Sequence, residues 1–442
     1  MDQILPYILS PMDLLIYGII IFVCYFLLKK SSHNQSEEGS AKHVVIVGGG
    51  FAGVAAAINL KRNLGDTPAK VTIINKHTYH LFTPSLYEVA TSEEPKKNVA
   101  IPLRKIFTEG VKLLHNKVEK IDTAKQILTL DDKEKVDYDY LVLATGSQPA
   151  YMGIPGLKEY ATGFKNMHDA LTIREQIRNR CCKDGKCDRK VQVVIGGGGF
   201  AGTELAAELL TYKDKIALQH GLDKNCLEVT IIQGSDSLLK ELDPRVSKIA
   251  TKRLEEPNVH FAFGGHIKEV KKDIVYTDDG KSYPFAILIW TGGVTPNHLA
   301  QENNLPITKR GALLVNDYLQ VQGFSNIFSA GDSAGYVIDN ATLRTAPNVA
   351  QVAEEQGQIV GRNIAHLLKG ERLEFYKFRH WGYVVPLKGY YAVAELSYNI
   401  HLRGFMGWIM QQLVLLRYLF GILPLWEAIR RFDTFEMEMD KH

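Results

Sequence analysis

The chain has 442 residues, 45% of them hydrophobic, which is enough for two or three domains with full hydrophobic cores. Its formal charge of +3 is nearly balanced and it contains no block of basic residues, so nucleic acid is not an expected partner. The cysteines are too few and too clustered for a disulfide framework, which favours a reducing compartment around the catalytic part: Cys24, Cys181, Cys182, Cys187 and Cys226.

Residues 4–28 form an almost wholly apolar stretch in which Asp13 is the only charged residue. A helix needs about 20 apolar residues to cross a bilayer, and this stretch reaches that length. Lys29 and Lys30 follow directly, which places the C-terminal side in the cytoplasm. We therefore predict a membrane anchor and linker over residues 1–40, with one uncleaved span and the catalytic domains on the cytoplasmic face or the equivalent organelle face. A targeting segment or a buried helix is the alternative interpretation.

The first globular segment opens with a β-branched run that leads directly into a glycine loop and a helix. The glycines are Gly48, Gly50 and Gly53, in the spacing that allows a tight turn, a close approach of pyrophosphate and close helix–strand packing. The helix that begins at Phe51 and Ala52 presents free N–H groups and a positive dipole end to phosphates. The loop therefore predicts a dinucleotide site.

The residue expected to bind the ribose of that dinucleotide is not an acid. In dinucleotide-binding folds an Asp or Glu stands about 20 residues beyond the loop, at the end of the second strand. Here the position holds Asn75, followed by Lys76. An amide accepts one hydroxyl hydrogen bond, but the charge-assisted contact is lost. Further along, an apolar run ends in Thr145 and Gly146, which predicts a tight turn beside the cofactor or, alternatively, ordinary core.

A second glycine loop, formed by Gly197, Gly199 and Gly202, repeats the first. Two such loops in one chain predict one bound flavin and one passing nicotinamide nucleotide. The helix after the second loop carries Glu204 and Glu208 on one face, so at least one is expected to be solvated or paired.

At the end of the following strand the acidic position is again an amide, Gln233. A carboxylate there would repel the 2′-phosphate of NADPH, whereas Gln does not, so discrimination between NADH and NADPH is predicted to be weak.

The polar segment 180–190 contains three of the cysteines, but their spacing does not match a zinc site and no pair of histidines completes four ligands. We therefore expect an exposed loop and no metal.

The chain then returns to a strand that ends in Gly292 and Gly293, and later to a short strand that ends in Gly331 and Asp332. A carboxylate at that turn can contact ribityl hydroxyls or lie near a flavin phosphate. The helix over residues 349–364 has a small-residue face suited to close packing on a cofactor. The first unit is therefore expected to be discontinuous, with the nicotinamide unit inserted into it.

The C-terminal part differs in kind. Residues 405–423 are strongly apolar but interrupted by polar side chains, and Trp426, Ile429 and Phe432 are expected to share one face, opposite Arg430 and Arg431. This pattern predicts helices that lie in a membrane interface rather than cross it. A core helix or a homodimer interface is the alternative.

These features together resemble the type II NADH:quinone oxidoreductases, single-subunit, non-pumping respiratory dehydrogenases among the flavoproteins with two dinucleotide-binding domains. The resemblance runs from about residue 43 to the C-terminal region. The motifs occur in the family's order: Gly48-x-Gly50-x-x-Gly53, His80-Leu-Phe-Thr83-Pro84, Ala144-Thr145-Gly146, Gly197-x-Gly199-x-x-Gly202-x-Glu204, Gly331-Asp332 and Ala350-Gln351-x-Ala353.

The resemblance implies an α/β fold with two Rossmann-like domains, to which the residue patterns above add an N-terminal transmembrane helix and C-terminal amphipathic membrane-associated helices. FAD would be held by the first loop and Asp332, NAD(P)H would dock at the second loop, and quinone would approach beside Gln351. The implied divisions are the FAD-binding domain at 41–165 and 299–370, the NAD(P)H-binding domain at 166–298, and the membrane-association region at 371–442.

Side chains with expected catalytic roles are Glu204, Gln351 and Glu355. The family's quinone motif usually ends in Gln where this chain has Glu355, which could donate a proton to the quinone if burial raises its pKa. A single membrane span has too few polar groups for ion pumping.

Two other classes share these features. A sulfide:quinone oxidoreductase or a disulfide reductase would need cysteines beside the flavin, and the cysteines here lie elsewhere. A membrane-tethered flavoprotein that senses NAD(P)H and docks partners would not need turnover. The reaction with quinone separates these interpretations.

Overall fold

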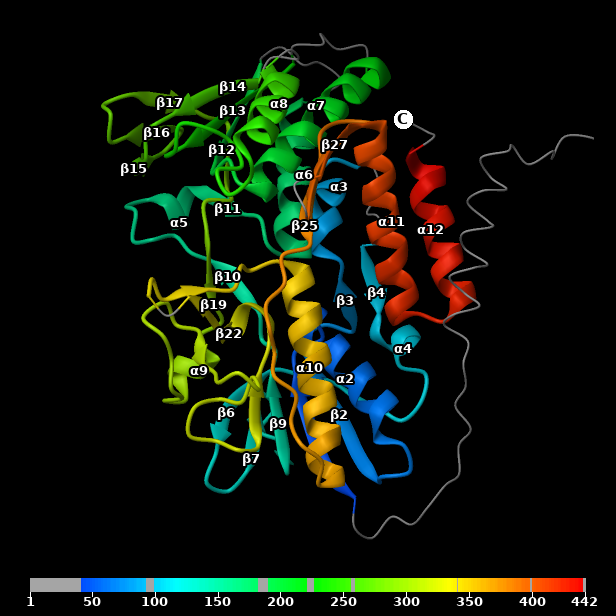
Figure 1. The fold of residues 1–442 in the computed structure, drawn as a ribbon. Helices are drawn as coiled ribbons and strands as arrows, with labels where there is room; N and C mark the ends of the chain where they lie inside the picture. The colour runs from blue at the N-terminus through cyan, green and yellow to red at the C-terminus, as the bar shows by residue number, and fades with distance from the viewer. Residues whose placement is uncertain are drawn as a thin grey trace, which may run out of the picture.

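The computed structural model describes residues 41–92, 99–181, 190–220, 226–255, 259–339, 341–397 and 400–439. The predicted N-terminal anchor and most of the cysteine-containing loop lie outside these residues. Figure 1 shows two parallel sheets, one in each half of the molecule, with two helices of the C-terminal region running along one side.

The first sheet contains five parallel strands and begins where the described chain begins. Its strands, in spatial order, are β21 (Ile327–Ser329), β9 (Tyr140–Leu143), β1 (Lys42–Val47), β2 (Ala69–Asn75) and β5 (Lys112–His115). The side chains of its central strands are apolar on both faces and almost fully buried, as expected for a parallel sheet covered by helices. Its edge strand β21 comes from a part of the chain that follows the second sheet.

The second sheet repeats this arrangement with five parallel strands. Its strands, in spatial order, are β11 (Ala161–Gly163), β18 (Ile287–Trp290), β12 (Val191–Gly196), β13 (Leu227–Gln233) and β14 (Val259–Phe263). In each sheet a glycine loop follows the third strand of the order and the predicted amide ends the fourth. The structure therefore confirms the predicted α/β class.

Three antiparallel sheets of three strands accompany the parallel ones. They consist of β6 (Val118–Asp122), β7 (Ile127–Leu130) and β8 (Lys135–Asp137); β15 (Ile267–Lys271), β16 (Ile274–Thr277) and β17 (Ser282–Pro284); and β25 (Gly382–Pro386), β26 (Ala392–Leu396) and β27 (Ile400–Gly404). The paired short strands are β3 (Tyr79–Leu81) with β4 (Ala100–Pro102), β10 (Ser147–Pro149) with β19 (Val294–Pro296), β20 (Leu313–Leu314) with β22 (Ala334–Gly335), and β23 (Val337–Asp339) with β24 (Arg344–Thr345).

The helices cover the sheets and form the C-terminal layer. They are α2 (Phe51–Leu64), α3 (Leu86–Ala90), α4 (Leu103–Ile106), α5 (Leu157–Tyr160), α6 (Met167–Cys181), α7 (Phe200–His220), α8 (Pro244–Glu255), α9 (Leu299–Glu302), α10 (Ala350–Lys369), α11 (Phe405–Ile422) and α12 (Leu425–Met439), with 3-10 turns at Thr83–Ser85 and Gly331–Ser333.

Helices α2 and α10 lie side by side against the first sheet (Figure 1). Gly357 and Gly361 of α10 permit this close approach, because a Cβ on either would collide with the backbone of α2 at Ala52 or Ala56. The small-residue face that was predicted to pack on a cofactor packs on α2 instead, because its glycines face the α2 backbone.

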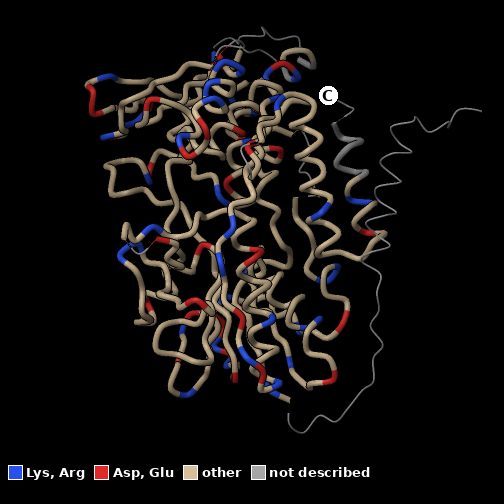
Figure 2. Tube along the Cα trace, in the orientation of Figure 1, with Lys and Arg blue, Asp and Glu red and all other residues tan. Residues whose placement is uncertain are grey.

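Helices α11 and α12 run next to each other along one side of both halves (Figure 1). Arg417 is the only charged residue of α11, and the helix is almost free of charge in Figure 2. In α12 the predicted faces are wrong in part, because Phe432 packs on the core and Arg431 is buried against Glu427, whereas Trp426 is exposed. The ion pair with Glu427 allows the Arg431 side chain to be buried.

Candidate active site

The first glycine loop has the geometry that its spacing predicts. Gly48 has a φ of +111°, and a Cβ there would collide with the carbonyl oxygen of Ala144. A Cβ on Gly53 would likewise collide with the carbonyl oxygen of Gly48. At Gly50, by contrast, a Cβ would meet nothing within 4 Å. The loop thus packs tightly on its inner side and leaves its middle glycine facing open space, where a pyrophosphate can approach the backbone.

The second glycine loop repeats these features residue by residue. Gly197 has a φ of +115°, a Cβ on Gly202 would collide with the Gly197 carbonyl, and Gly199 faces open space. The turn at Gly292, predicted as a cofactor contact, lies against this loop, since a Cβ on Gly197 would come 2.7 Å from the Gly292 Cα. Its neighbour Gly293 has a φ of +154°.

The amides in the ribose-reading positions have a use that the sequence did not suggest. Asn75 Oδ1 accepts a hydrogen bond from the backbone N–H of Gly49 at 2.9 Å, and Gln233 Oε1 accepts one from the N–H of Gly198 at 2.7 Å. Each amide nitrogen also donates within the chain, that of Asn75 to the carbonyl of His77 at 2.7 Å and that of Gln233 to a serine hydroxyl at 2.7 Å. Both amides therefore brace their glycine loops.

The predicted carboxylate Asp332 belongs to a polar cluster that the sequence did not reveal. It accepts hydrogen bonds from the Ser147 hydroxyl and from Lys165 Nζ, the latter at 3.1 Å. Gly331 precedes it with a φ of +75°, and its N–H donates to Gln356 Oε1 at 2.8 Å. The predicted turn at Thr145 and Gly146 leads into the strand that carries Ser147, with a φ of +68° at Gly146.

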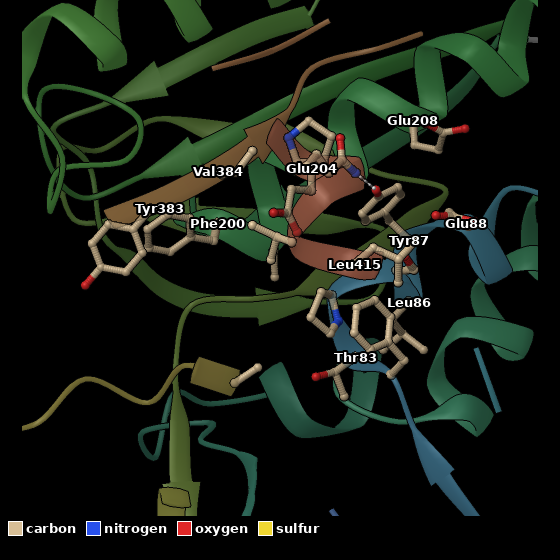
Figure 3. A pocket seen from close by; sticks show the side chains of 18 of the residues that line it. Thr83, Leu86, Tyr87, Glu88, Phe200, Glu204, Glu208, Tyr383, Val384 and Leu415 are labelled. Carbon is tan, nitrogen blue, oxygen red and sulfur yellow. Dashed lines mark hydrogen bonds between the residues drawn. The ribbon is translucent and has the colours of Figure 1, made fainter. Parts of the chain in front are cut away.

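One large cavity of about 960 Å³ joins the two halves of the molecule. Its walls come from the starts of α2, α7 and α10, from strand β25 and from α11. Figure 3 shows Phe200 and Glu204 of α7 projecting into the space that Thr83 and Leu86 line from the other side. The sequence-predicted residues in its lining are Phe51, Thr83, Pro84, Glu204, Ala350 and Gln351.

Other predicted residues lie outside this lining. The glycines of both loops and Ala52 shape the backbone, Lys76 is exposed, and Asn75, Gln233 and Asp332 have the partners described above. Residues that the sequence analysis missed include Lys165, Trp381, Tyr383 and Tyr418, all in the lining. Their positions in sequence carry no motif, and only the packing of distant segments brings them here.

Glu204 is the most perturbed acid of the cavity. Burial raises the pKa of its carboxyl from the ordinary 4.5 to about 8. At neutral pH it is therefore mostly protonated and can give up a proton. Neighbouring acids of the lining are Glu88 and Glu208 (Figure 3), and burial also raises the pKa of Tyr87 well above its usual range.

The predicted quinone-side residues lie at the start of α10. Gln351 Nε2 donates to Glu355 Oε1 at 3.5 Å, and Trp381 also hydrogen-bonds Glu355. Burial raises the pKa of Glu355, which is the condition set for a proton donor. Glu355 itself is not part of the cavity lining, but the Gln351 and Trp381 side chains that it contacts are.

The adjacent residue Glu354 forms a two-pronged ion pair with Arg417 of α11, at 2.7 and 3.1 Å. This pair fastens the C-terminal helix to the helix that carries Gln351. Within the described residues no cluster of His, Cys, Asp and Glu could hold a metal ion, and Cys181 and Cys226 are buried.

Several apolar side chains of the C-terminal region are exposed. Trp381, Tyr390 and Val414 line the cavity, and the others are Phe405, Met406, Leu413 and Trp426. Among the described helices, α11 is long and apolar enough to cross a membrane by length and composition. This helix forms part of the cavity wall, because Gln411, Gln412, Leu415 and Arg417 belong to the lining.

Comparison with known proteins places these features in context. The sequence profile of the pyridine nucleotide-disulphide oxidoreductases matches residues 42–357. The chain is 27% identical over 390 residues to the type II NADH:quinone oxidoreductase of Staphylococcus haemolyticus, covering 86% of this chain and 96% of that protein. It is 28% identical over 361 residues to that of Staphylococcus epidermidis, covering 78% and 87%.

Two solved structures share the fold. The structure of NDH2 from Plasmodium falciparum in complex with NADH superposes with a TM-score of 0.77 at 18% identity, covering 89% of this chain and 97% of that one. The sulfide:quinone oxidoreductase of Aquifex aeolicus superposes with a TM-score of 0.71 at 19% identity, covering 88% and 92%.

Proposed function

The chain belongs to the pyridine nucleotide-disulphide oxidoreductase family, and we propose that it is a membrane-bound type II NADH:quinone oxidoreductase. It takes a hydride from NADH onto FAD and passes two electrons on to a quinone, without pumping ions. In this proposal residues 41–165 and 299–370 bind FAD, residues 166–298 bind NAD(P)H, and residues 371–442 associate with the membrane.

The observation that carries this proposal is the convergence of three helix starts on one cavity. Phe51 at the start of α2, Glu204 in the first turns of α7 and Gln351 in the first turn of α10 all line it. Helix N-termini favour anionic groups, and two of these three follow glycine loops built for pyrophosphate. The helices that follow both glycine loops and the start of α10 therefore face one cavity, in which the reactive ends of two nucleotides and an acceptor can meet.

The residues present fit FAD at the first loop. The open space at Gly50 admits a pyrophosphate, and the Asp332 cluster with Lys165 and Ser147 offers polar groups for the ribityl chain. When bound, FAD supplies the two-electron chemistry between nicotinamide and quinone. The chain itself supplies binding, orientation and exclusion of water.

The residues of the second loop fit NADH and tolerate NADPH. Gly199 faces open space as Gly50 does, and Gln233 presents no negative charge to a 2′-phosphate. Because Gln233 Oε1 is held by Gly198, the ribose meets a neutral side chain whose position is fixed.

The quinone binds beside Gln351, whose amide hydrogen-bonds Glu355 and can turn a hydrogen toward a quinone carbonyl. Reduction of the quinone needs protons as well as electrons. Glu204 and Glu355 are the candidates, because burial raises the pKa of both carboxyls, that of Glu204 to about 8.

The C-terminal helices α11 and α12 attach the enzyme to the bilayer. Their exposed apolar and aromatic side chains, among them Phe405, Met406 and Trp426, support this attachment. A quinone is membrane-soluble, so a cavity that has α11 as one wall can receive it from the lipid. The same face is a candidate homodimer interface. The predicted N-terminal span adds a second attachment and places the catalytic part on the cytoplasmic face or the equivalent organelle face.

The test uses the full chain purified in detergent. The purified protein should be yellow. NADH should bleach it rapidly, and NADPH should bleach it equally or more weakly. A short-chain quinone should then reoxidise it. Bleaching by sulfide alone would instead indicate a sulfide:quinone oxidoreductase, although no cysteine stands in the described lining of the cavity. Bleaching by NADH without reoxidation by quinone would favour a sensor.

A further inference from the structure

A buried histidine lies directly beneath the first glycine loop. His80 of β3 is fully buried, and its ring packs edge-on against Phe51 with centroids 4.9 Å apart. Its Nδ1 lies 3.1 Å from the carbonyl oxygen of Gly49, and its Nε2 lies 2.8 Å from the hydroxyl of Tyr418. The ring thus connects the loop to helix α11, across 338 positions of sequence.

The direction of these hydrogen bonds follows from their partners. The Gly49 carbonyl can only accept, so Nδ1 carries the hydrogen. Burial lowers the pKa of His80 to about 4, so the ring is neutral and Nε2 is an acceptor. The Tyr418 hydroxyl must therefore donate to Nε2, and it holds the ring in the tautomer that serves Gly49.

This contact orients the peptide unit between Gly49 and Gly50. In a planar trans peptide the carbonyl and the following N–H point in opposite directions. Because His80 Nδ1 holds the Gly49 carbonyl, the N–H of Gly50 points away from His80, and a Cβ on Gly50 would meet no atom within 4 Å. Asn75 fixes the same residue from its other side, through the Gly49 N–H. The loop is therefore held in the donor arrangement that a pyrophosphate needs.

Tyr418 is held in place by its own surroundings. Its side chain is buried against the rings of Phe51 and Phe82, with centroids 5.0 and 5.3 Å away. Its neighbour Arg417 pairs with Glu354 of α10. The apolar helix α11 is therefore joined at adjacent residues to the glycine loop and to the helix that carries Gln351.

We propose that Tyr418 and His80 are positioning residues for FAD: the Tyr418 hydroxyl fixes His80, and His80 aims the Gly50 N–H at the pyrophosphate. Helix α11 is in this sense part of the FAD site as well as of the membrane face. The inference rests on the proposed function, since it takes FAD as the occupant of the first loop.

The test compares Tyr418→Phe, which removes one hydroxyl, with the wild-type chain in detergent. The readout is the rate of FAD release into flavin-free buffer, followed by the rise in free-flavin fluorescence. Loss of one buried hydrogen bond predicts about fivefold to tenfold faster release. Tyr336→Phe is the matched control, because its hydroxyl donates to the Tyr376 carbonyl at 2.9 Å, away from the loop. It should release FAD at the wild-type rate.

A second comparison separates positioning from general loosening. In a His80→Phe background the Tyr418→Phe change should cause no further acceleration, because the hydroxyl acts through the imidazole. His80→Asn should release FAD more slowly than His80→Phe, because its amide N–H reaches close to the position of Nδ1 and can donate to the Gly49 carbonyl.

Release at the wild-type rate from Tyr418→Phe, or equal acceleration in both backgrounds, would overturn this inference alone. A wild-type chain that binds no FAD would overturn the proposed function and this inference with it.

Discussion

Replacing Glu204 by Gln is expected to slow quinone reduction and to remove a step in its pH dependence. Glu204 lies in the second turn of α7 and lines the cavity, and burial raises its pKa from 4.5 to about 8. At pH 7 roughly nine in ten of these carboxyls are then protonated. Gln keeps the size and hydrogen-bonding groups of the side chain but carries no transferable proton.

The size of the effect follows from the role proposed for this acid. A positioned general acid contributes about 10²-fold or more, so reoxidation of the reduced enzyme by quinone should fall by about that factor below pH 8. In the wild-type chain the rate should stay constant below pH 8 and fall above it, as the proton is lost.

The raised pKa of Glu204 also makes the unfolding free energy depend on pH. Because the folded state binds this proton more tightly than the unfolded state, the associated stability is complete below pH 4.5 and is lost as the pH rises through about 8. The full shift corresponds to at most about 5 kcal/mol, and water in the cavity reduces this figure. The unfolding free energy of Glu204→Gln should lack this decline.

Rapid mixing of the NADH-reduced enzyme with a short-chain quinone measures the reoxidation rate directly. The measurement should run from about pH 6 to about pH 10, because this range includes the expected pKa of Glu204. The reductive half-reaction with NADH serves as the internal reference. Glu208→Gln is the matched control, since it lies one turn further along the same helix and also lines the cavity. Wild-type reoxidation rates in Glu204→Gln, or an equal loss in Glu208→Gln, would refute the reasoning.

Further predictions concern the nucleotide sites and the quinone side. Gly53→Ala should lower the unfolding free energy by about 1–3 kcal/mol in chemical denaturation, because its Cβ would collide with the Gly48 carbonyl. Gly50→Ala should fold normally, with an ordinary φ of −81°, but bind FAD about tenfold or more weakly in flavin titrations, because its methyl group enters the pyrophosphate space; unchanged affinity would contradict this. Gln233→Glu should lower kcat/KM for NADPH relative to NADH by about tenfold, since a carboxylate repels the 2′-phosphate; an unchanged ratio in steady-state kinetics would count against it. Glu355→Gln should slow quinone reduction and alter its pH profile, and an unchanged profile in the same rapid-mixing assay would exclude Glu355 as a proton donor.

Local patterns sufficed to predict the two glycine loops and the strands that lead into them. Their spacing, 48–53 and 197–202, encodes a turn whose sterics depend on neighbours within one βα unit. The α/β class followed from the same repetition. The motif positions of Asn75 and Gln233 predicted that both amides stand where the ribose is bound. They did not predict that each amide oxygen accepts a hydrogen bond from its own glycine loop.

Contacts between distant segments could not be read in this way. Lys165 reaches Asp332 across 167 positions, and Arg417 reaches Glu354 across 63, with no spacing rule to connect them. The outward side of α12 was predicted wrongly in part because a hydrophobic face is ambiguous when Glu427 can neutralise a buried Arg431.

The amino-acid order alone thus determined that this chain binds two dinucleotides, because each loop is a local structure whose glycines are required wherever it folds. His80 had a sequence signal, because it is the first residue of the motif His80-Leu-Phe-Thr83-Pro84, but its partner had none. That Tyr418 of the last apolar helix would meet it under the first loop was decided only by tertiary packing. A hydrogen bond between residues so far apart depends on how the sheets and the C-terminal helices come together, and no periodicity records that arrangement.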